Sequence, residues 1–164
     1  MMDRAKVGAA CARFEPRECN LRQILSRVCE QVHCVQPARQ ILIALPQPAE
    51  CIAGDPLLLE QLLAILVFNA AKYSSLNAPI EATGVVQGRE LLIRVADFGI
   101  GVPAQDVPQL FTPLFRSRNA ADYPGSGLGL CFGKHIAALH GGSIAVESQE
   151  GMGSTFTVNL PLGR

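Results

Sequence analysis

Three short motifs carry side chains suited to a phosphorylated ligand, and the first consists of Asn69, Lys72 and Tyr73. Residues spaced in this way share one face of a helix. A carboxamide oxygen is a good ligand for Mg²⁺, an ammonium group suits a phosphate, and a tyrosine ring can cover a flat base. Taken alone, this segment fits a solvated helix end with one half-buried tyrosine better than it fits a binding site.

The second motif is Asp97-Phe98-Gly99-Ile100-Gly101, which directly follows an apolar, strand-like run. Its glycines let a backbone come close to a ligand, and a carboxylate at a strand end can accept a hydrogen bond from an exocyclic amine. The run 99–104 also fits the dinucleotide fingerprint G-x-G-x-x-A. We reject that interpretation because the carboxylate would repel a pyrophosphate and Pro103 does not open an ordinary helix. A plain glycine turn remains an alternative.

The third motif is Gly125-Ser126-Gly127-Leu128-Gly129-Leu130, at the start of a predicted helix. Backbone N–H groups at a helix N-terminus bind phosphate. The motif lacks the G-K-[ST] ending of a P-loop. A flexible hinge is the alternative, although glycine at alternate positions is costly where only a hinge is needed.

The elements that must position these motifs are predicted from hydrophobic periodicity and turn signals. Asp55-Pro56 is a strong helix start, and Gly141-Gly142 ends a helix. The loop 103–127, with one helical turn expected near Leu110, is long enough to indicate a functional role. The predicted helices are 20–35, 55–73 and 128–139, and the predicted strands are 41–45, 51–53, 80–86, 91–95, 143–147 and 155–160.

These elements predict an α/β (α+β) two-layer sandwich, in which a mixed sheet of about five strands is covered on one face by about three helices. The chain has 164 residues, 49% hydrophobic and 17% charged, which is typical of one globular domain. Lys+Arg and Asp+Glu both number 14 and Trp is absent, so a nucleic-acid partner is not expected.

A membrane span and a zinc site are not expected either. The apolar run 57–68 is interrupted by Glu60 and Gln61 and is short for a membrane span, and no signal peptide is evident near the N-terminus. The 6 cysteines include no C-x-x-C pair. We therefore expect reduced thiols in a cytoplasmic protein and no zinc site.

In their order, the three motifs resemble the catalytic ATP-binding domain of bacterial sensor histidine kinases, which belong to the superfamily of gyrase, chaperone, kinase and mismatch-repair ATPases with the Bergerat fold. Three further segments carry the resemblance: Phe111-Thr112-Pro113-Leu114-Phe115-Arg116 is similar to the F box, Lys134-His135-Ile136 with His140-Gly141-Gly142 to the stretch after the second glycine box, and Gly153-Ser154-Thr155-Phe156-Thr157-Val158 to the closing strand. The resemblance runs from about Phe14 to Pro161. It implies a lead-in over 1–13 and the kinase domain over 14–164.

The resemblance implies ATP and Mg²⁺ as ligands and a role for each matching residue. Asn69 would bind the Mg²⁺ that bridges the phosphates, Lys72 would contact phosphate, and Tyr73 would lie over the adenine. Asp97 would accept a hydrogen bond from the adenine amine. Three residues are expected close to that base: Gly99, Gly101 and Thr155.

The resemblance also implies a mobile ATP lid over Phe111 to Ser126. Phe111 and Ser126 are expected at the nucleotide, and Arg116 would reach the γ-phosphate or the acceptor domain. The second glycine box would present its backbone to the phosphates, through Gly127, Leu128, Gly129 and Leu130.

Ile65 departs from the family pattern, which usually has a polar residue one turn before the Mg²⁺-binding asparagine. Members that hydrolyse ATP fast place a glutamate there, and Ile65 cannot activate water. This argues against gyrase-like or chaperone-like ATPase activity. It also leaves the Mg²⁺ shell one polar neighbour short, so we expect Ile65→Asn to raise phosphotransfer.

The histidines give a second departure, because His33, His135 and His140 all lack the sequence context of a phosphoacceptor. Each is interpreted as a hydrogen-bonded or surface histidine. The resemblance therefore implies a protein-histidine kinase domain that phosphorylates a separate histidine-containing dimerisation domain and acts upstream of a response regulator. The isolated domain would be a monomer in the cytoplasm without direct membrane contact.

Two alternatives remain open. One is a degenerate nucleotide-binding or docking module without kinase activity, which Ile65 favours and which Asn69, Asp97 and the glycine boxes oppose. The other is a Ser/Thr kinase of the anti-sigma type, which shares the fold. The F box and the Leu128-Gly129-Leu130 helix start argue against it.

Overall fold

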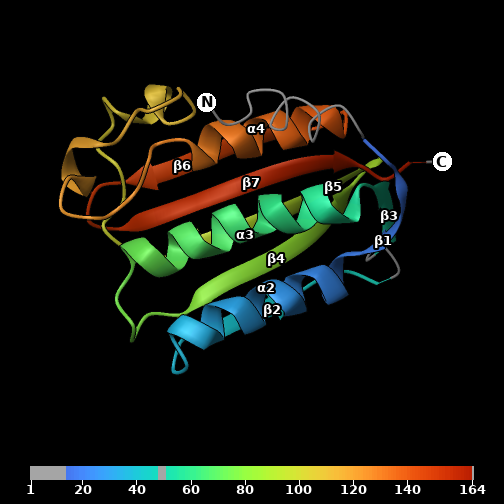
Figure 1. The fold of residues 1–164 in the computed structure, drawn as a ribbon, viewed down its shortest axis with the longest axis horizontal. Helices are drawn as coiled ribbons and strands as arrows, with labels where there is room; N and C mark the ends of the chain where they lie inside the picture. Colours follow the sequence, from blue (N-terminus) through green and yellow to red (C-terminus); the bar gives the residue numbers. More distant parts are fainter. Residues whose placement is uncertain (1–13, 48–50, 164) are drawn as a thin grey trace, which may run out of the picture.

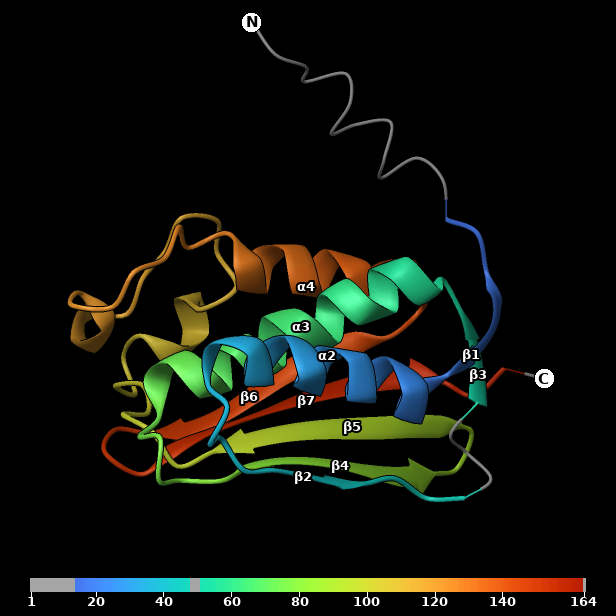
Figure 2. The ribbon, with the colours of Figure 1, turned by 60° about the horizontal axis from the view of Figure 1, so that its bottom comes forward.

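A five-stranded mixed sheet carries three helices on one of its faces, as Figures 1 and 2 show. The computed structural model describes residues 14–47 and 51–163, so the predicted lead-in over 1–13 lies outside the described residues. The sheet order is β2-β4-β5-β7-β6, in which β2 runs parallel to β4 and the other neighbours are antiparallel. The strands are β2 (Ile41–Ala44), β4 (Ile80–Gln87), β5 (Glu90–Asp97), β6 (Ser143–Gln149) and β7 (Gly153–Pro161).

The helices are α2 (Leu21–Val35), α3 (Pro56–Tyr73) and α4 (Gly129–Leu139). The predicted two-layer α/β sandwich is therefore confirmed. Period-2 alternation directs Leu91, Ile93 and Val95 of β5 toward the helices, where they are buried. The opposite face of the sheet carries no helix among the described residues (Figure 2).

Helix α3 lies in the middle of the helical layer and forms much of the core. By length and composition alone it would qualify as a membrane span, with a mean hydropathy of 1.2 over 18 residues. In the fold it is a core helix, because Leu59, Leu62, Leu63, Leu66, Val67, Ala70 and Ala71 are all buried. Glu60, the charged residue that interrupts the apolar run, lies on the outer side and contacts Arg27 at 3.1 Å.

The start of α3 obeys the capping rule. The Asp55 carboxylate accepts hydrogen bonds from the backbone N–H groups of Leu57 and Leu58 at 3.0 and 3.2 Å, and Pro56 occupies the first turn. Its other oxygen accepts from the Glu15 backbone at 3.1 Å. Burial would raise the pKa of Asp55, but these backbone hydrogen bonds outweigh burial and hold the pKa below its ordinary value.

A small second sheet lies at the end of the molecule where the described chain begins and ends (Figure 1). In it β1 (Arg17–Asn20) pairs antiparallel with β3 (Cys51–Gly54). Strand β1 was not predicted, because its sequence has no apolar alternation and only Cys19 of its four residues is buried. All described cysteines are free, and among the described residues no cluster of His, Cys, Asp or Glu could hold a metal ion.

Two of the three histidines are held by hydrogen bonds. Buried His140 accepts a hydrogen bond at Nε2 from the Asp55 backbone N–H at 3.0 Å, and its Nδ1 lies 2.8 Å from the Ile136 carbonyl. His33 Nε2 lies 2.8 Å from the Arg39 carbonyl. His135 is exposed on α4. This agrees with the interpretation of the three residues as hydrogen-bonded or surface histidines.

Candidate functional site

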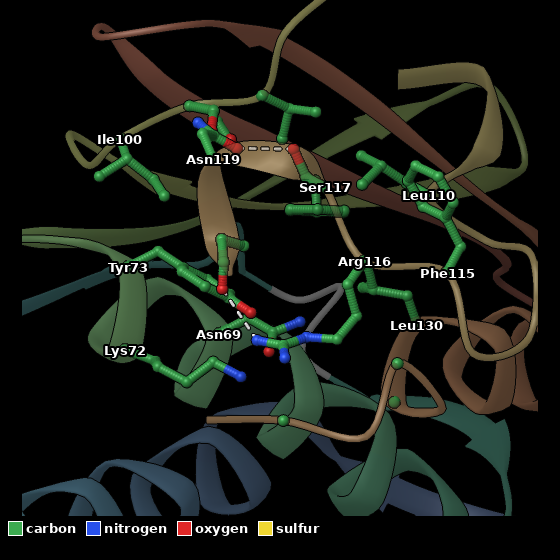
Figure 3. A pocket seen from close by; sticks show the side chains of 18 of the residues that line it. Asn69, Lys72, Tyr73, Ile100, Leu110, Phe115, Arg116, Ser117, Asn119 and Leu130 are labelled. Carbon is green, nitrogen blue, oxygen red and sulfur yellow. Dashed lines mark hydrogen bonds between the residues drawn. The ribbon is translucent and has the colours of Figure 1, made fainter. Parts of the chain in front are cut away.

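A cavity of about 250 Å³ opens between α3, the end of β5, the long loop before α4, and the start of α4 (Figure 3). These elements come from three separate parts of the sequence, and each part contributes one of the three motifs. The predicted site residues that line the cavity are Asn69, Lys72, Tyr73, Asp97, Gly101, Arg116, Ser126, Gly127, Gly129 and Leu130. The predicted Gly99, Phe111, Leu128 and Thr155 do not line it.

The last turns of α3 contribute three neighbouring polar side chains. Among the residues that the structure describes, the Asn69 amide has no hydrogen-bond partner, so its oxygen is available to a ligand. Lys72 Nζ donates to the Pro124 carbonyl at 2.8 Å and lies 4.6 Å from the centre of the Tyr73 ring. That ring lies 5.1 Å from the ring of Tyr123.

Asp97 ends β5 and places a buried carboxylate in the cavity wall. Its side chain accepts a hydrogen bond from the Gly99 backbone N–H at 2.9 Å, and the residue is 8% exposed. Burial raises the pKa of Asp97, and hydrogen bonds from the Gly99 and Ser154 backbones offset this only in part. A carboxylate with a raised pKa in a pocket marks a candidate ligand-binding group.

The glycines after Asp97 lie against other backbone segments. A Cβ at Gly99 would lie 2.1 Å from the Tyr73 carbonyl oxygen, and one at Gly101 would lie 2.0 Å from the Gln149 carbonyl oxygen. Gly101 also has a φ of 64°. The two positions therefore need glycine because other backbone segments press against them. Gly101 also lines the cavity, and Gly99 does not.

The loop before α4 (residues 103–128) includes the predicted lid of Phe111 to Ser126, and from here on we call the whole loop the lid. It contains two short helices, η1 (Val107–Gln109) and η2 (Arg118–Ala120). The predicted turn near Leu110 corresponds to η1, and η2 was missed. Arg116 extends into the cavity and donates hydrogen bonds to the carbonyls of Ala120 and Tyr123 (Figure 3). The lid ends meet where the Leu114 N–H donates to the Gly127 carbonyl at 2.9 Å.

Phe111 and Thr155, both predicted near the nucleotide, lie outside the cavity lining. The Phe111 ring packs edge-to-face on Phe156 with the ring centres 6.3 Å apart, and Phe115 lines the cavity in its place. In β7, Ser154 and Phe156 are buried on the helix side while Thr155 lies on the opposite face of the sheet. Because a strand alternates its side chains, a shift of one residue moves a side chain out of the site.

The N-terminus of α4 provides backbone donors. Its N-cap position, Leu128, makes no side-chain cap, so the first N–H groups of the helix are open to a ligand. Gly129 and Leu130 line the cavity, whereas the Leu128 side chain is exposed. Gly127 has a φ of 73°, and a Cβ there would lie 2.7 Å from the Leu114 backbone. Here glycine is required by the crossing of the lid ends.

The structure also brings to the cavity residues that sequence analysis did not assign. Some of them lie within the predicted motifs, next to a residue that was assigned to the site. Ile100 lies between Gly99 and Gly101, and Ser154 precedes Thr155. Ser117 and Asn119 have no sequence signal, because tertiary contacts of the lid place them. The unassigned lining residues are Ile100, Val102, Leu110, Phe115, Ser117, Asn119, Ala120, Gly125, Ser154 and Phe156.

Ile65 does not line the cavity; it is a half-buried residue of α3 on the side that faces α4. A Cβ at Gly129 would lie 3.6 Å from the Ile65 Cγ2, and one at Gly133 would lie 3.9 Å from it, which is van der Waals distance, so the side chain lies against this face of α4. Ile65 is therefore a packing residue at the edge of the site.

We expect Ile65→Asn to lower the free energy of unfolding by about 1–2 kcal/mol, because it removes apolar contact and places an amide in an apolar helix interface. Denaturant titration measures this, with Ile65→Val as the packing control. The predicted gain in phosphotransfer must be measured at a temperature where both variants are folded. An unchanged stability would contradict the packing role of Ile65.

The chain is similar to known proteins in sequence and fold. Residues 54–164 match the family described as "Histidine kinase-, DNA gyrase B-, and HSP90-like ATPase". The chain is 32% identical to the sensor histidine kinase RcsC of Escherichia coli K12 over 99% of its own length, and 42% identical to the sensor-like histidine kinase SenX3 of Mycobacterium tuberculosis H37Rv over 67%. It spans 18% of RcsC and 27% of SenX3. The structure of the mycobacterial sensor histidine kinase MprB superposes with a TM-score of 0.81, at 23% identity, covering 90% of this chain and 99% of that one.

Proposed function

The chain belongs to the family of histidine kinase-, DNA gyrase B- and HSP90-like ATPases, and from this membership we propose that it transfers the γ-phosphoryl group of ATP to a histidine on a separate dimerisation domain. RcsC and SenX3 are both named as histidine kinases, which favours a kinase over the other members of the family. Family membership implies ATP binding. The phosphoryl acceptor and the roles of individual residues are part of the proposal.

The observation that carries this proposal is the composition of a single cavity wall. A buried carboxylate, Asp97, two cations, Lys72 and Arg116, and the uncapped N-terminus of α4 all line the same space. The carboxylate suits the amine edge of adenine, and the cations and backbone N–H groups suit phosphates. This set matches one adenine nucleotide.

The residues present also fit a magnesium ion, with Asn69 as the protein ligand. Mg²⁺ usually keeps several waters and is held by one or two protein oxygens together with substrate phosphates. The unpartnered Asn69 amide in the cavity provides one such oxygen. When bound, the ion would neutralise charge on the phosphates.

The side chains would act mainly by positioning and charge neutralisation, as is general for phosphoryl transfer. In the structure the lid carbonyls of Pro124, Ala120 and Tyr123 hold Lys72 and Arg116 in the cavity. Hydrogen bonds from cations to phosphate are stronger than those to neutral carbonyls. A triphosphate would therefore draw both side chains away from these carbonyls, and Tyr73 would cover the base.

The acceptor histidine is proposed to lie outside this chain. His33 and His140 are held by hydrogen bonds, and His135 is exposed on α4 and does not line the cavity. The proposed partners are a dimerisation domain, in the same protein or in a partner chain, and a downstream response regulator. We further propose that the isolated domain is a monomer in the cytoplasm, without membrane or nucleic-acid contact.

The direct test supplies the purified chain with a dimerisation domain from a related kinase and with γ-labelled ATP and Mg²⁺. We expect label on the acceptor domain that is lost in acid and kept in alkali, because phosphohistidine is acid-labile. Acid-stable label would indicate a Ser/Thr kinase. ATP binding without transfer to any acceptor domain tried would favour a nucleotide-binding module.

A further inference from the structure

The side-chain amide of Asn119 joins the lid to the floor of the cavity. Asn119 lies in η2 and lines the cavity (Figure 3). Its Nδ2 donates to the Gly101 carbonyl at 2.9 Å, and its Oδ1 accepts from the Ser117 hydroxyl at 2.6 Å. Both the nitrogen and the oxygen of the amide are hydrogen-bonded, and the nitrogen donates to a residue 18 positions earlier in the sequence.

The Gly101 carbonyl, which accepts this hydrogen bond, belongs to a segment packed against the turn between β6 and β7. Gly101 is in the left-handed region with a φ of 64°, and its Cα lies so close to the turn between β6 and β7 that an added Cβ would be 2.0 Å from the Gln149 carbonyl oxygen. The neighbouring Ile100 carbonyl accepts from the Gly151 N–H at 2.7 Å. The loop after Asp97 is therefore held against the turn between β6 and β7 by contacts that do not involve the lid.

The preceding part of the lid is held independently. Buried Asp106 accepts from the Ser117 hydroxyl at 3.2 Å and from the Arg118 backbone N–H at 3.0 Å, and pairs with the Arg118 guanidinium at 2.9 Å. These hydrogen bonds hold the pKa of Asp106 below its ordinary value. Asp106 therefore holds residues 117 and 118 against the start of the lid. Among the side-chain hydrogen bonds of the described residues, only that of Asn119 links this turn to the loop after Asp97.

The segment after Asn119 contacts the other wall of the cavity. Tyr123 lies against Tyr73, and the Pro124 carbonyl accepts from Lys72. The position of η2 therefore sets the position of the segment that covers the phosphate-binding cations.

We propose that Asn119 is a positioning residue that holds the lid closed over a bound nucleotide by its hydrogen bond to the Gly101 carbonyl. This inference rests on the proposed nucleotide-binding function and adds to it a residue that fixes how long the nucleotide stays bound. Asn119 acts through the lid, so its loss should affect KM and release more than kcat.

The test uses Asn119→Ala, which removes the donor to Gly101 without adding a charge to a cavity proposed to hold phosphates, and the Ser117 hydroxyl keeps its hydrogen bond to Asp106. Losing one hydrogen bond of this kind should speed release of a fluorescent ADP analogue by about three- to tenfold. In the same variant KM for ATP should rise by a similar factor, while kcat changes less than about twofold. Asn77→Ala, the same change at an exposed residue outside the cavity, is the matched control.

A readout without nucleotide separates this proposal from the proposed function. In the ligand-free chain, Asn119→Ala should speed tryptic cleavage after Arg116 and Arg118, with the thermal unfolding midpoint retained. If the wild-type chain binds no ADP analogue, the proposed function fails, and the cleavage rate still decides whether Asn119 holds the lid. Wild-type cleavage in Asn119→Ala, or wild-type release where the analogue binds, would overturn the proposal.

Discussion

Asp97→Asn should lower the affinity of the chain for adenine nucleotides by about 100-fold. Its carboxylate is the only acidic side chain that lines the cavity in the described part of the chain. An asparagine keeps the size of the residue and can still accept from the Gly99 N–H, but it directs an N–H₂ group toward the amine of adenine. A site built for one hydrogen-bond pattern discriminates strongly against the wrong one, because the buried groups are left unpaired.

The same substitution should not destabilise the ligand-free fold. Burial raises the pKa of Asp97, so the folded chain holds its proton to higher pH than the unfolded chain does. Stability then falls as the pH rises from the ordinary aspartate value of 3.8 through the raised one, and this loss persists at neutral pH. Removing the charge removes the loss, so the thermal midpoint of Asp97→Asn at neutral pH should equal or exceed that of the wild type.

Calorimetric titration with ADP and thermal unfolding together test this prediction, with Asp122→Asn as the control because Asp122 is exposed and does not line the cavity. Wild-type affinity should also fall on acidification, as Asp97 takes up a proton. Tight ADP binding by Asp97→Asn would show that the base lies elsewhere. Loss of both binding and folding would instead give Asp97 a structural role.

Asn69→Ala should abolish the Mg²⁺ dependence of ATP binding and lower phosphotransfer on the order of 10²- to 10³-fold, the usual loss when one group that stabilises transition-state charge is removed. The Asn69 amide lines the cavity without a partner among the described residues, so its removal breaks no hydrogen bond seen in the fold. Stability should therefore change little, by less than about 0.5 kcal/mol.

Titration of a non-hydrolysable ATP analogue with and without Mg²⁺ measures the first effect, and labelled ATP with an acceptor domain measures the second. Asn77→Ala on the exposed turn after α3 is the control. The proposed metal position would be wrong if Asn69→Ala kept the wild-type difference between the two titrations. In that case the ion would be held by another group or by the phosphates alone.

The elements that hold the site could be predicted because their signals are local. Asp55-Pro56 marks the start of α3, Gly141-Gly142 the end of α4, and period-2 alternation the strands, and each agrees with the structure to within a few residues. The three motifs lie at the ends of these elements, and ten of the residues predicted from them and from the lid line one cavity.

The remaining features depend on tertiary contacts that a sequence does not display. Thr155 was predicted at the site, but it is Ser154 that lines the cavity. A motif does not reveal which face of a strand meets the helices. The contacts of Asp106 with Arg118 and of Asn119 with Gly101 join segments 12 and 18 residues apart. The polar, glycine-rich composition of the lid gives no sign of these pairings.

Calorimetric titration of the wild-type chain decides whether the cavity binds an adenine nucleotide together with magnesium. ADP and a non-hydrolysable ATP analogue would be titrated with and without Mg²⁺. We expect both nucleotides to bind, and to bind more tightly with the ion present. Absence of binding at millimolar nucleotide would contradict this expectation and would leave a folded module with another role.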